Sequence, residues 1–235
     1  MYQTGKRMEI ARRIIDGASS NLLKNLKYYD SRGKDLAGII ESIEKYRQQI
    51  DNCQKINELM GIEGNIRHVY YDAFNLIIDD FEFDTRTKQP PSNEVNALIS
   101  FGNMLCYSQC LKAIHQTQLN PTISFLHAPG ERRYSLSLDL AEIFKPLLVD
   151  RVIFRVLNKK ELQKKDFDKQ LNRVILKDKG KKTFISAIEE RLNETIKHRT
   201  LNKHVSYKHL VKLECYKLQK HCLELEEYKP FKMWW

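Results

Sequence analysis

The sequence predicts an all-α fold formed by one multi-helix domain over residues 1–235. Apolar residues recur at steps of three and four along most of the chain, which is the spacing of amphipathic helices. The alternation of apolar and polar residues that marks half-buried strands is nearly absent. With 235 residues and no internal repeat, the chain is long enough to bury one sizeable core.

The expected helices follow from apolar spacing and from turn residues. The first carries apolar residues at helical steps from Met8 to Leu26, and Gly33 can cap its C-terminus. Two prolines and Ser-Asn at residues 90–93 predict a loop and an N-cap for the fourth helix. Pro146 should kink the fifth helix rather than end it, because the apolar pattern resumes directly after it. The predicted helices after the first cover residues 34–51, 63–80, 94–117, 136–158, 182–199 and 207–224.

Basic charge is concentrated in the C-terminal third of the chain. The formal net charge is +10, and residues 155–221 hold 19 Lys and Arg against 8 Asp and Glu, whereas the rest holds 21 against 22. A local excess of this kind is typical of a surface that binds nucleic acid through its phosphates. The alternative is a solvated helix face that only keeps the protein soluble.

The composition favours a cytoplasmic location. No apolar run approaches the roughly 20 residues of a membrane span, and the first residues lack the apolar core of a signal peptide. The five cysteines are an odd number without a CxxC pair, which fits reduced thiols. Cys106 and Cys110, one helical turn apart, are interpreted as core residues rather than metal ligands.

Residues 120–150 combine a histidine with two carboxylates. His127 lies in a proline-bracketed connection, and Asp139 and Glu142 follow on one face of the next predicted helix. Imidazole and carboxylate oxygens bind divalent metal ions, and a cation would remove the cost of burying Asp139 among leucines. The alternatives are a hydrogen-bonded core histidine and a solvent-facing Glu142.

Glu63 is a further candidate acid. It stands between Gly61 and Gly64 at the expected start of the helix at 63–80, where the helix dipole favours a carboxylate. Arg67, four residues later, can pair with Glu63 or orient it. Taken alone, Glu63 is equally an ordinary acid of a first helical turn.

These segments resemble the CRISPR-associated integrase family, the nuclease-like subunit of the spacer-acquisition machinery, and most closely its type I-B forms. The similarity spans the chain and is most specific in GIEGNIRHVYY, in the FLH and DLAE segments, and in the ending VKLECYKLQKHCLELEEYKPF. It implies a catalytic Mg²⁺ or Mn²⁺ ion bound by Glu63, His127 and Glu142, with Asp139 supporting or sharing the site. The absence of cysteine from this set argues against a structural zinc.

The resemblance also implies an activity, partners and a domain plan. Family members are metal-dependent DNA endonucleases and integrases that insert captured double-stranded fragments into a CRISPR repeat by attack of a 3′-hydroxyl on a phosphodiester. They form homodimers through a β-rich N-terminal domain and act with a small ferredoxin-like companion. This chain is then the helical catalytic domain without that N-terminal part. Its expected subregions are first helices at 1–60, a metal-site core at 61–158 and a basic DNA-holding part at 159–235.

Several further expectations surround this site. Arg132, Arg133 and Lys145 are candidates for phosphate contacts, and surface arginines are the alternative. The aromatic ending should pack on the helical body or a second subunit. The alternative function is a non-enzymatic basic DNA-binding module whose acids are structural. The chain has neither a His-Asp dipeptide nor an HExxH motif, which argues against an HD-type phosphohydrolase or a zinc protease.

Overall fold

A computed structural model describes residues 4–128, 133–171 and 173–234. Helices dominate these ranges, and short strands lie in the C-terminal half. The α-helices are α1 (Thr4–Asp30), α2 (Ala37–Arg47), α3 (Ile56–Asp72), α4 (Phe74–Ile77), α5 (Glu94–Ile114), α6 (Ser135–Lys145), α7 (Arg151–Asn158), α8 (Asp178–Asn193) and α9 (Tyr207–Cys222). The strands are β1 (Phe167–Gln170), β2 (Arg173–Leu176), β3 (Thr195–Lys197) and β4 (His204–Ser206). The shorter helical turns are η1 (Ile50–Asn52), η2 (Pro146–Asp150) and η3 (Lys164–Asp166).

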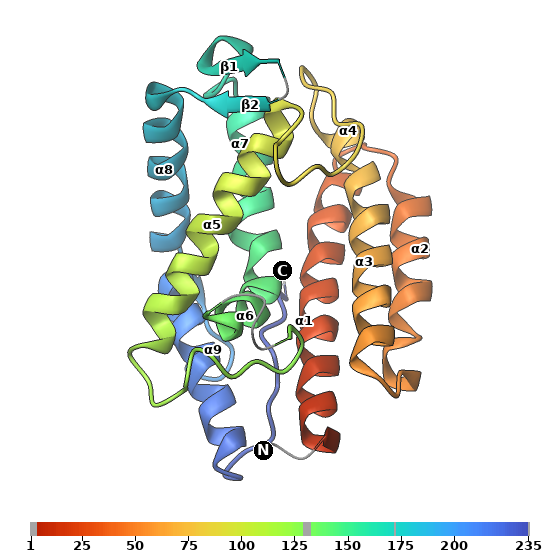
Figure 1. Cartoon of the computed structure of the whole chain (residues 1–235), viewed down its shortest axis with the longest axis vertical. Coiled ribbons are helices and arrows are strands. Elements are labelled where there is room, and N and C mark those ends of the chain that lie inside the picture. The colour runs from red at the N-terminus through yellow and green to blue at the C-terminus, as the bar shows by residue number, and fades with distance from the viewer. Residues whose placement is uncertain (1–3, 129–132, 172, 235) are drawn as a thin grey trace.

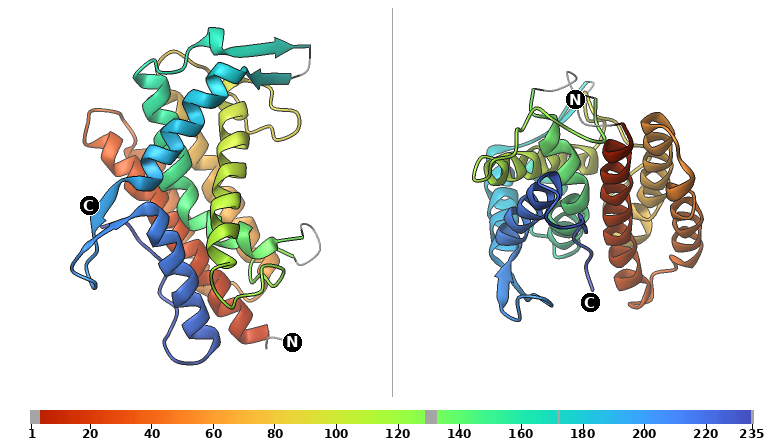
Figure 2. Two further views of the ribbon diagram at one scale, coloured as in Figure 1. Left: turned by 90° about the vertical axis from the view of Figure 1, so that its left-hand side faces the viewer. Right: turned by 90° about the horizontal axis from the view of Figure 1, so that it is seen from below.

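The helices form two groups that meet along α1. Helices α1, α2 and α3 lie side by side, and α5 to α9 occupy the other part of the molecule (Figure 1). Helix α1 contacts α2 and α3 on one side and α6 on the other. The view from below shows the same division, with the C-terminal segment between the two groups (Figure 2). The candidate acids, on α3 and α6, therefore come from different groups.

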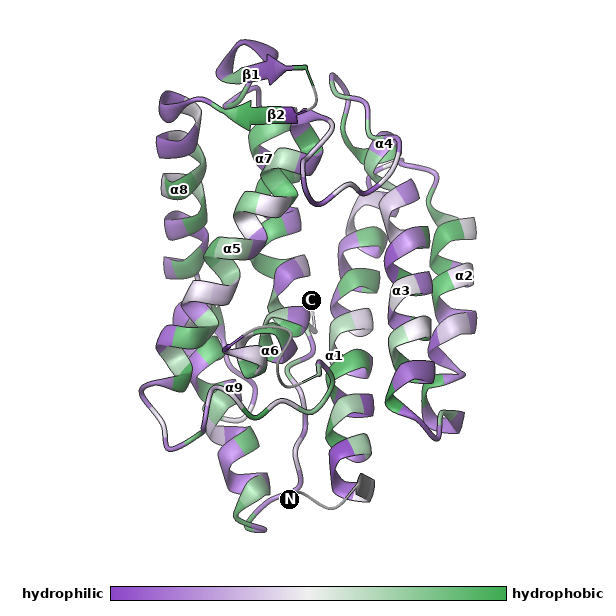
Figure 3. Ribbon diagram, viewed as in Figure 1, coloured by the Kyte–Doolittle hydropathy of each residue, from purple (hydrophilic) through white to green (hydrophobic). Residues whose placement is uncertain are grey.

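Helix α1 forms as predicted because its apolar residues fall on one face. Ile10, Ile14 and Leu26 have no exposed surface. Gly33 follows the helix with φ = +87°, the left-handed conformation that glycine adopts at C-caps. Hydrophobic and hydrophilic residues alternate around most of the helices in the same way (Figure 3). Of the helices in the described ranges, none combines the length and apolar character needed to cross a bilayer.

The segment after α9 packs back onto the helical body, as expected for the aromatic ending. Tyr228 and Phe231 are buried, and Asn21 of α1 donates from Nδ2 to the carbonyl of Phe231 at 3.1 Å. The Oδ1 atom of Asn21 accepts from the amide of Met233 at 2.8 Å. A second bond from Nδ2, to the carbonyl of Ile143 at 2.9 Å, ties the same asparagine to α6. Trp235 lies outside the described residues.

The helix expected at 136–158 continues through Pro146, as predicted. Helix α6, a π-helical turn at η2 and α7 follow one another without a loop, so the proline is accommodated by a local change of helical period. This turn packs against α5 at Gly102, where an added Cβ would lie 2.4 Å from Cγ1 of Val149. Glycine is required here by the close approach of the two segments.

The prediction of an all-α fold is wrong. Strands β1 and β2 pair antiparallel with Phe167 opposite Leu176, and β3 and β4 pair with Ile196 opposite Val205. Each strand has only three or four residues, and β1 buries only Phe167. Such short, charged segments show too little alternation for a strand pattern to be recognised. The fold is a helical body with two β-hairpins, and the first hairpin covers one end of α5 and α7 (Figure 1).

The start of the third helix was also predicted incorrectly. Helix α3 begins at Ile56, so Glu63 lies in its third turn and not at its N-terminus. Gly61 and Gly64, expected to flank the helix start, are interior residues of α3 with nothing within 4 Å of an added Cβ. The helix dipole therefore does not account for the carboxylate of Glu63.

Candidate metal centre

The candidate site lies where α3 faces α6 and the π-helical turn that follows it. Helix α3 contributes Glu63 and Arg67, one turn apart on one face. Helix α6 contributes Glu142 and Lys145, and η2 ends with Asp150. All five side chains are at most 20% exposed. The site is thus a buried polar cluster between the two helix groups.

Arg67 connects the acids of this cluster. Its Nε atom lies 3.4 Å from Oε1 of Glu63, and Nη2 donates to Oε2 of Glu142 at 2.9 Å. Its Nη1 atom lies 3.7 Å from Oδ2 of Asp150. Burial alone would lower the pKa of Arg67, but the negative charges of Glu142 and its neighbours raise it. The guanidinium is therefore a permanent positive charge among three carboxyl groups.

Glu142 is an ionised carboxylate held between two cations. Burial alone would raise its pKa, but the positive charges of Lys145 and Arg67 outweigh burial and lower the pKa to about 2. Lys145 donates from Nζ to Oε1 of Glu142, and its own pKa is raised by that carboxylate. Lys145, expected to contact phosphate, is thus buried beside Glu142, and its ammonium also lies 4.9 Å from the ring centroid of Tyr107.

Glu63 is perturbed in the opposite direction. Burial raises its pKa, and the negative charge of Glu142 raises it further, while Arg67, Lys145 and His127 act against the increase. These mutual effects place Glu63, Glu142 and His127 within electrostatic reach of one another. Two carboxylates that disfavour each other's charge form an environment that a divalent cation stabilises.

His127 is held in one orientation by Asp139. The Nδ1 atom of His127 lies 2.7 Å from Oδ1 of Asp139, so Nδ1–H donates to the carboxylate and the Nε2 lone pair is left for another partner. Burial would lower the pKa of His127, but the hydrogen bond and charge of Asp139 raise it. Metal-binding histidines are typically oriented by a carboxylate in this way.

Both carboxylate oxygens of Asp139 accept hydrogen bonds from the loop that carries His127. Its Oδ2 atom accepts from the amides of Phe125 at 2.6 Å and Leu126 at 3.0 Å, and Oδ1 accepts from the amide of His127 at 3.0 Å in addition to the imidazole. Asp139 has no exposed surface. Its oxygens are therefore occupied by four donors, and its role in this structure is to shape the loop and orient His127.

Asp150 belongs to the cluster and was missed in the sequence. It is fully buried, and burial raises its pKa to about 6 against the opposing effect of Arg67. Its Oδ2 atom has no hydrogen-bond partner among the described residues. The available signal was a lone acid in the apolar run KPLLVDRVIF, the same signal that singled out Asp139.

The arginines expected near the site are placed differently. Arg133 is exposed, and its guanidinium lies over the ring of Tyr134 at 5.4 Å from the centroid. Arg132 lies outside the described residues. No ion pair between Arg133 and a carboxylate is present in the described ranges, so its contact with phosphate stays a prediction.

Two carboxylates and an imidazole are ligand types that suit a divalent cation, but in this structure the carboxylates pair with Arg67 and Lys145. As they stand, no three His, Cys, Asp or Glu side chains of the described ranges are grouped tightly enough to hold a metal ion. Both oxygens of Glu142 contact the cations Arg67 and Lys145 instead. The Oδ2 atom of Asp150, which has no hydrogen-bond partner among the described residues, lies 3.7 Å from Nη1 of Arg67.

Known proteins with similar sequences identify the family of this chain. Residues 1–190 match the family model described as CRISPR associated protein Cas1. The chain is 50% identical over 234 residues to the CRISPR-associated endonuclease Cas1 2 of Thermodesulfovibrio yellowstonii, with 99% of this chain and 71% of that protein covered. It is 40% identical to a CAS1 protein of known structure from Thermotoga maritima, with a TM-score of 0.84, 94% of this chain covered and 66% of that chain.

Two other solved structures share the fold at lower identity. A casposase bound to integration product has a TM-score of 0.87 at 22% identity and covers 96% of this chain and 63% of its own. The Cas6-RT-Cas1--Cas2 complex has a TM-score of 0.86 at 18% identity and covers 98% of this chain and 25% of its own. At these identities the likeness concerns the fold alone.

The comparisons correct one prediction and confirm another. The sequence predicted an all-α C-terminal domain of the family, but the similarity to the Thermodesulfovibrio yellowstonii protein runs through 99% of this chain, both β-hairpins included. The resemblance itself is confirmed by the family model and by the 50% identity. The chain belongs to the Cas1 family of CRISPR-associated proteins.

Proposed function

We propose that this chain is a divalent-metal-dependent DNA endonuclease and integrase that joins captured DNA fragments to a CRISPR repeat. The relative from Thermodesulfovibrio yellowstonii is named an endonuclease, and a structural neighbour is a casposase bound to integration product. The excess of basic residues at 155–221 supports a polyanionic substrate. We further propose that the chain acts as a homodimer with a small ferredoxin-like companion protein.

The observation that carries the proposal is the imidazole of His127, which Asp139 orients and which lies within electrostatic range of Glu63 and Glu142. Asp139 holds Nδ1, so the Nε2 atom is the one that would bind a cation, together with Glu63 and Glu142. Two carboxylates and one imidazole suit Mn²⁺, and the oxygen ligands also admit Mg²⁺. A bound cation of this kind polarises a phosphodiester and stabilises the leaving oxygen.

The other residues of the cluster have separate tasks. Asp139 keeps the loop of residues 125–127 in place and fixes the Nδ1–H tautomer of His127, which leaves the Nε2 lone pair facing away from the carboxylate. Arg67 and Lys145 neutralise Glu142 in the structure described and can turn toward a phosphodiester when Glu142 binds a cation. Asp150 offers Arg67 an alternative carboxylate, so that the guanidinium keeps a partner during this exchange.

One observation favours the second candidate, a DNA-binding module whose acids are structural. Glu142 is already neutralised by Arg67 and Lys145, as expected for an acid that serves packing alone. Cleavage of linear and branched DNA in Mn²⁺ or in chelator separates the two functions. We expect Glu63→Gln and His127→Ala to abolish the Mn²⁺-dependent cleavage, and Glu41→Gln, on the exposed face of α2, to retain it.

Two outcomes would refute the enzymatic proposal. The first is cleavage that persists in both site variants at the level of the parent. The second is cleavage that is equal in chelator and in Mn²⁺. The described cysteines form no disulfide, which is consistent with the cytoplasmic location that we propose.

A further inference from the structure

A basic cleft outside the candidate metal centre lies between the end of α1, helix α7 and the end of α8. Its volume is about 360 Å³, and none of the three proposed metal ligands lines it. Five of its lining residues are cationic and Glu194 is the single acid among them. The cations are Arg32, Arg151, Arg155, Lys159 and Arg191.

Three of these cations lack a balancing charge. Among the described residues, no carboxylate lies within ion-pair distance of Arg32, Arg151 or Lys159. The guanidinium groups of Arg32 and Arg151 both lie 4.4 Å from the ring centroid of Tyr28. Two positive charges that share one ring repel each other, so an anion in the cleft would stabilise them. The cleft has the electrostatics of an anion site.

The remaining two cations form the wall of the cleft. Arg191 donates to the carbonyl of Leu147 and to the hydroxyl of Tyr207, both at 2.9 Å, and pairs with Glu194. Arg155 pairs with Glu190 at 3.0 Å and lies 3.5 Å from Glu161. Glu190, Glu161 and Glu194 therefore pair with Arg155 and Arg191, and they do not neutralise the other three cations of the cleft.

Arg151 is held in place by a hydrogen bond to a buried asparagine. Its Nε atom donates at 2.9 Å to Oδ1 of Asn25, a buried residue whose Nδ2 atom donates to the hydroxyl of Tyr70 at 3.2 Å. Tyr29, also in the cleft, packs edge-on against Phe154. Burial raises its pKa to about 12, so its hydroxyl stays a hydrogen-bond donor. A fixed arginine, a phenol and two exposed cations suit the oxygens of a phosphate.

We propose that this cleft binds a backbone phosphate of duplex DNA, as a holding site separate from the candidate metal centre. This inference rests on the proposed DNA substrate but not on cleavage. The ring of Tyr28 is already engaged by two guanidinium groups, so the cleft recognises phosphate rather than stacks on a base. Asn25 connects Arg151 by hydrogen bonds to Tyr70 of α3, the helix that also carries Glu63 and Arg67.

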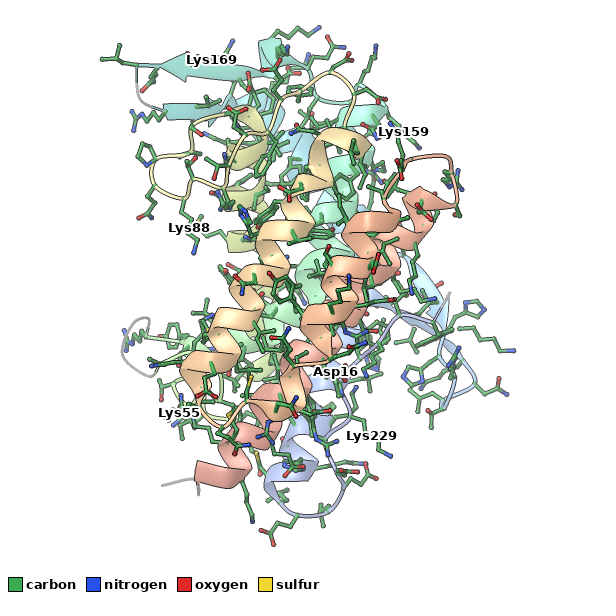
Figure 4. The ribbon with its side chains drawn as sticks, turned by 90° about the vertical axis from the view of Figure 1, so that its right-hand side faces the viewer. Asp16, Lys55, Lys88, Lys159, Lys169 and Lys229 are labelled. Atoms are coloured by element: carbon green, nitrogen blue, oxygen red, sulfur yellow. The ribbon has the colours of Figure 1, made fainter. Side chains whose placement is uncertain are left out.

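The test is duplex DNA binding in chelator, followed by fluorescence anisotropy over a range of salt concentrations. The variant is Arg32→Gln with Lys159→Gln, which removes two exposed charges of the cleft. The control is Lys45→Gln with Lys55→Gln, which removes the same charge from exposed positions outside the cleft. Figure 4 shows Lys159 in the upper part of the view and Lys55 in the lower part, on the other side. Circular dichroism checks that each variant is folded.

We expect the cleft variant to bind about ten-fold more weakly and its plot of log K against log salt to be flatter by about 2, since each lost phosphate contact contributes about 0.9. The control should behave as the parent. Arg151→Lys keeps the charge and should keep the slope while weakening binding. Equal effects of cleft and control variants, or no binding by the parent in chelator, would overturn the inference.

Two further measurements distinguish DNA binding in the cleft from metal-dependent cleavage and from binding of a small anion. Glu41→Gln, which lies outside both sites, should bind DNA as the parent does. Because binding is measured in chelator, where metal-dependent cleavage does not occur, a failure of the cleavage proposal leaves this result interpretable. Inorganic phosphate at millimolar concentration should compete weakly for the labelled duplex. Full displacement of DNA by inorganic phosphate would instead assign the cleft to a small anion and overturn its assignment to DNA.

Discussion

Replacing Asp150 by asparagine should stabilise the protein, and the gain should increase with pH. The carboxyl group of Asp150 is fully buried in η2 and borders the metal-centre cluster through Arg67. Burial raises its pKa from 3.8 to about 6. The asparagine side chain has nearly the shape of the protonated acid, without the cost of ionisation.

The size of the effect follows from the difference between the folded and unfolded pKa values. A raised carboxyl pKa means that the folded state binds the proton more tightly, so stability is complete below pH 3.8 and is lost as pH rises toward 6. Each pH unit in that window costs about 1.4 kcal/mol. The variant should therefore exceed the parent by about 1.5 kcal/mol at pH 5 and about 3 kcal/mol at pH 8.

Urea unfolding followed by circular dichroism at pH 5 and pH 8, in chelator, measures both differences. Asp72→Asn is the matched control, because the same substitution at the exposed end of α3 should change little at either pH. A gain from Asp150→Asn that is constant or smaller at pH 8 would refute the reasoning. A loss of stability at both values would show that Arg67 needs the charge of Asp150.

The same substitution should weaken metal binding. Without the charge of Asp150, Arg67 has two carboxyl partners left, Glu63 and Glu142, and both are proposed metal ligands. The guanidinium then competes more strongly with Mn²⁺. Isothermal titration calorimetry should show a higher Kd for Mn²⁺ in the variant, while unchanged or tighter binding would exclude Asp150 as the alternative partner of Arg67.

Three other substitutions or conditions test the site and its frame. Mn²⁺ binding should weaken as pH falls through the raised pKa of His127, because only the neutral imidazole binds a metal. Calorimetry that shows a constant affinity for Mn²⁺ from pH 5 to pH 8 would exclude His127 as a ligand. Asp139→Asn should lower the free energy of unfolding by about 2–4 kcal/mol, because four hydrogen-bond donors lose a charged acceptor. A loss under about 1 kcal/mol in urea unfolding would contradict the role of Asp139 in holding the loop. Gly102→Ala should lower the free energy of unfolding by about 1–3 kcal/mol, because the added Cβ clashes with Val149. Gly61→Ala has open space around the added Cβ and should stabilise α3. Equal thermal midpoints of the two variants would contradict the close packing at Gly102.

Much of the helical body could be predicted from local patterns. Asn93 caps α5 by accepting from the amide of Asn96, as the Pro-Pro-Ser-Asn segment indicated. The helix continues through Pro146 as a π-helical turn, as the apolar residues after it indicated. Both features depend on residues adjacent in sequence, where backbone preferences act directly.

The errors arose where local patterns were ambiguous. The helix expected to begin at residue 63 begins at Ile56, because Gly61 and Gly64 are tolerated inside α3, where packing of the other residues holds the helix. The β-hairpins escaped detection because a strand such as Thr195–Lys197 has one buried residue, and pairing with His204–Ser206 rather than burial defines it.

Helical periodicity, the basic C-terminal third and the residue types of the candidate metal site follow from composition and from near neighbours, so they could be inferred without a structure. Only the tertiary structure brought Arg67 to Glu142, 75 residues later in the chain, and placed Asp150 beside them. Tertiary packing alone also assembled the cleft from α1, α7 and α8. Contacts between distant segments depend on how helices pack, and helical spacing alone does not specify which faces meet.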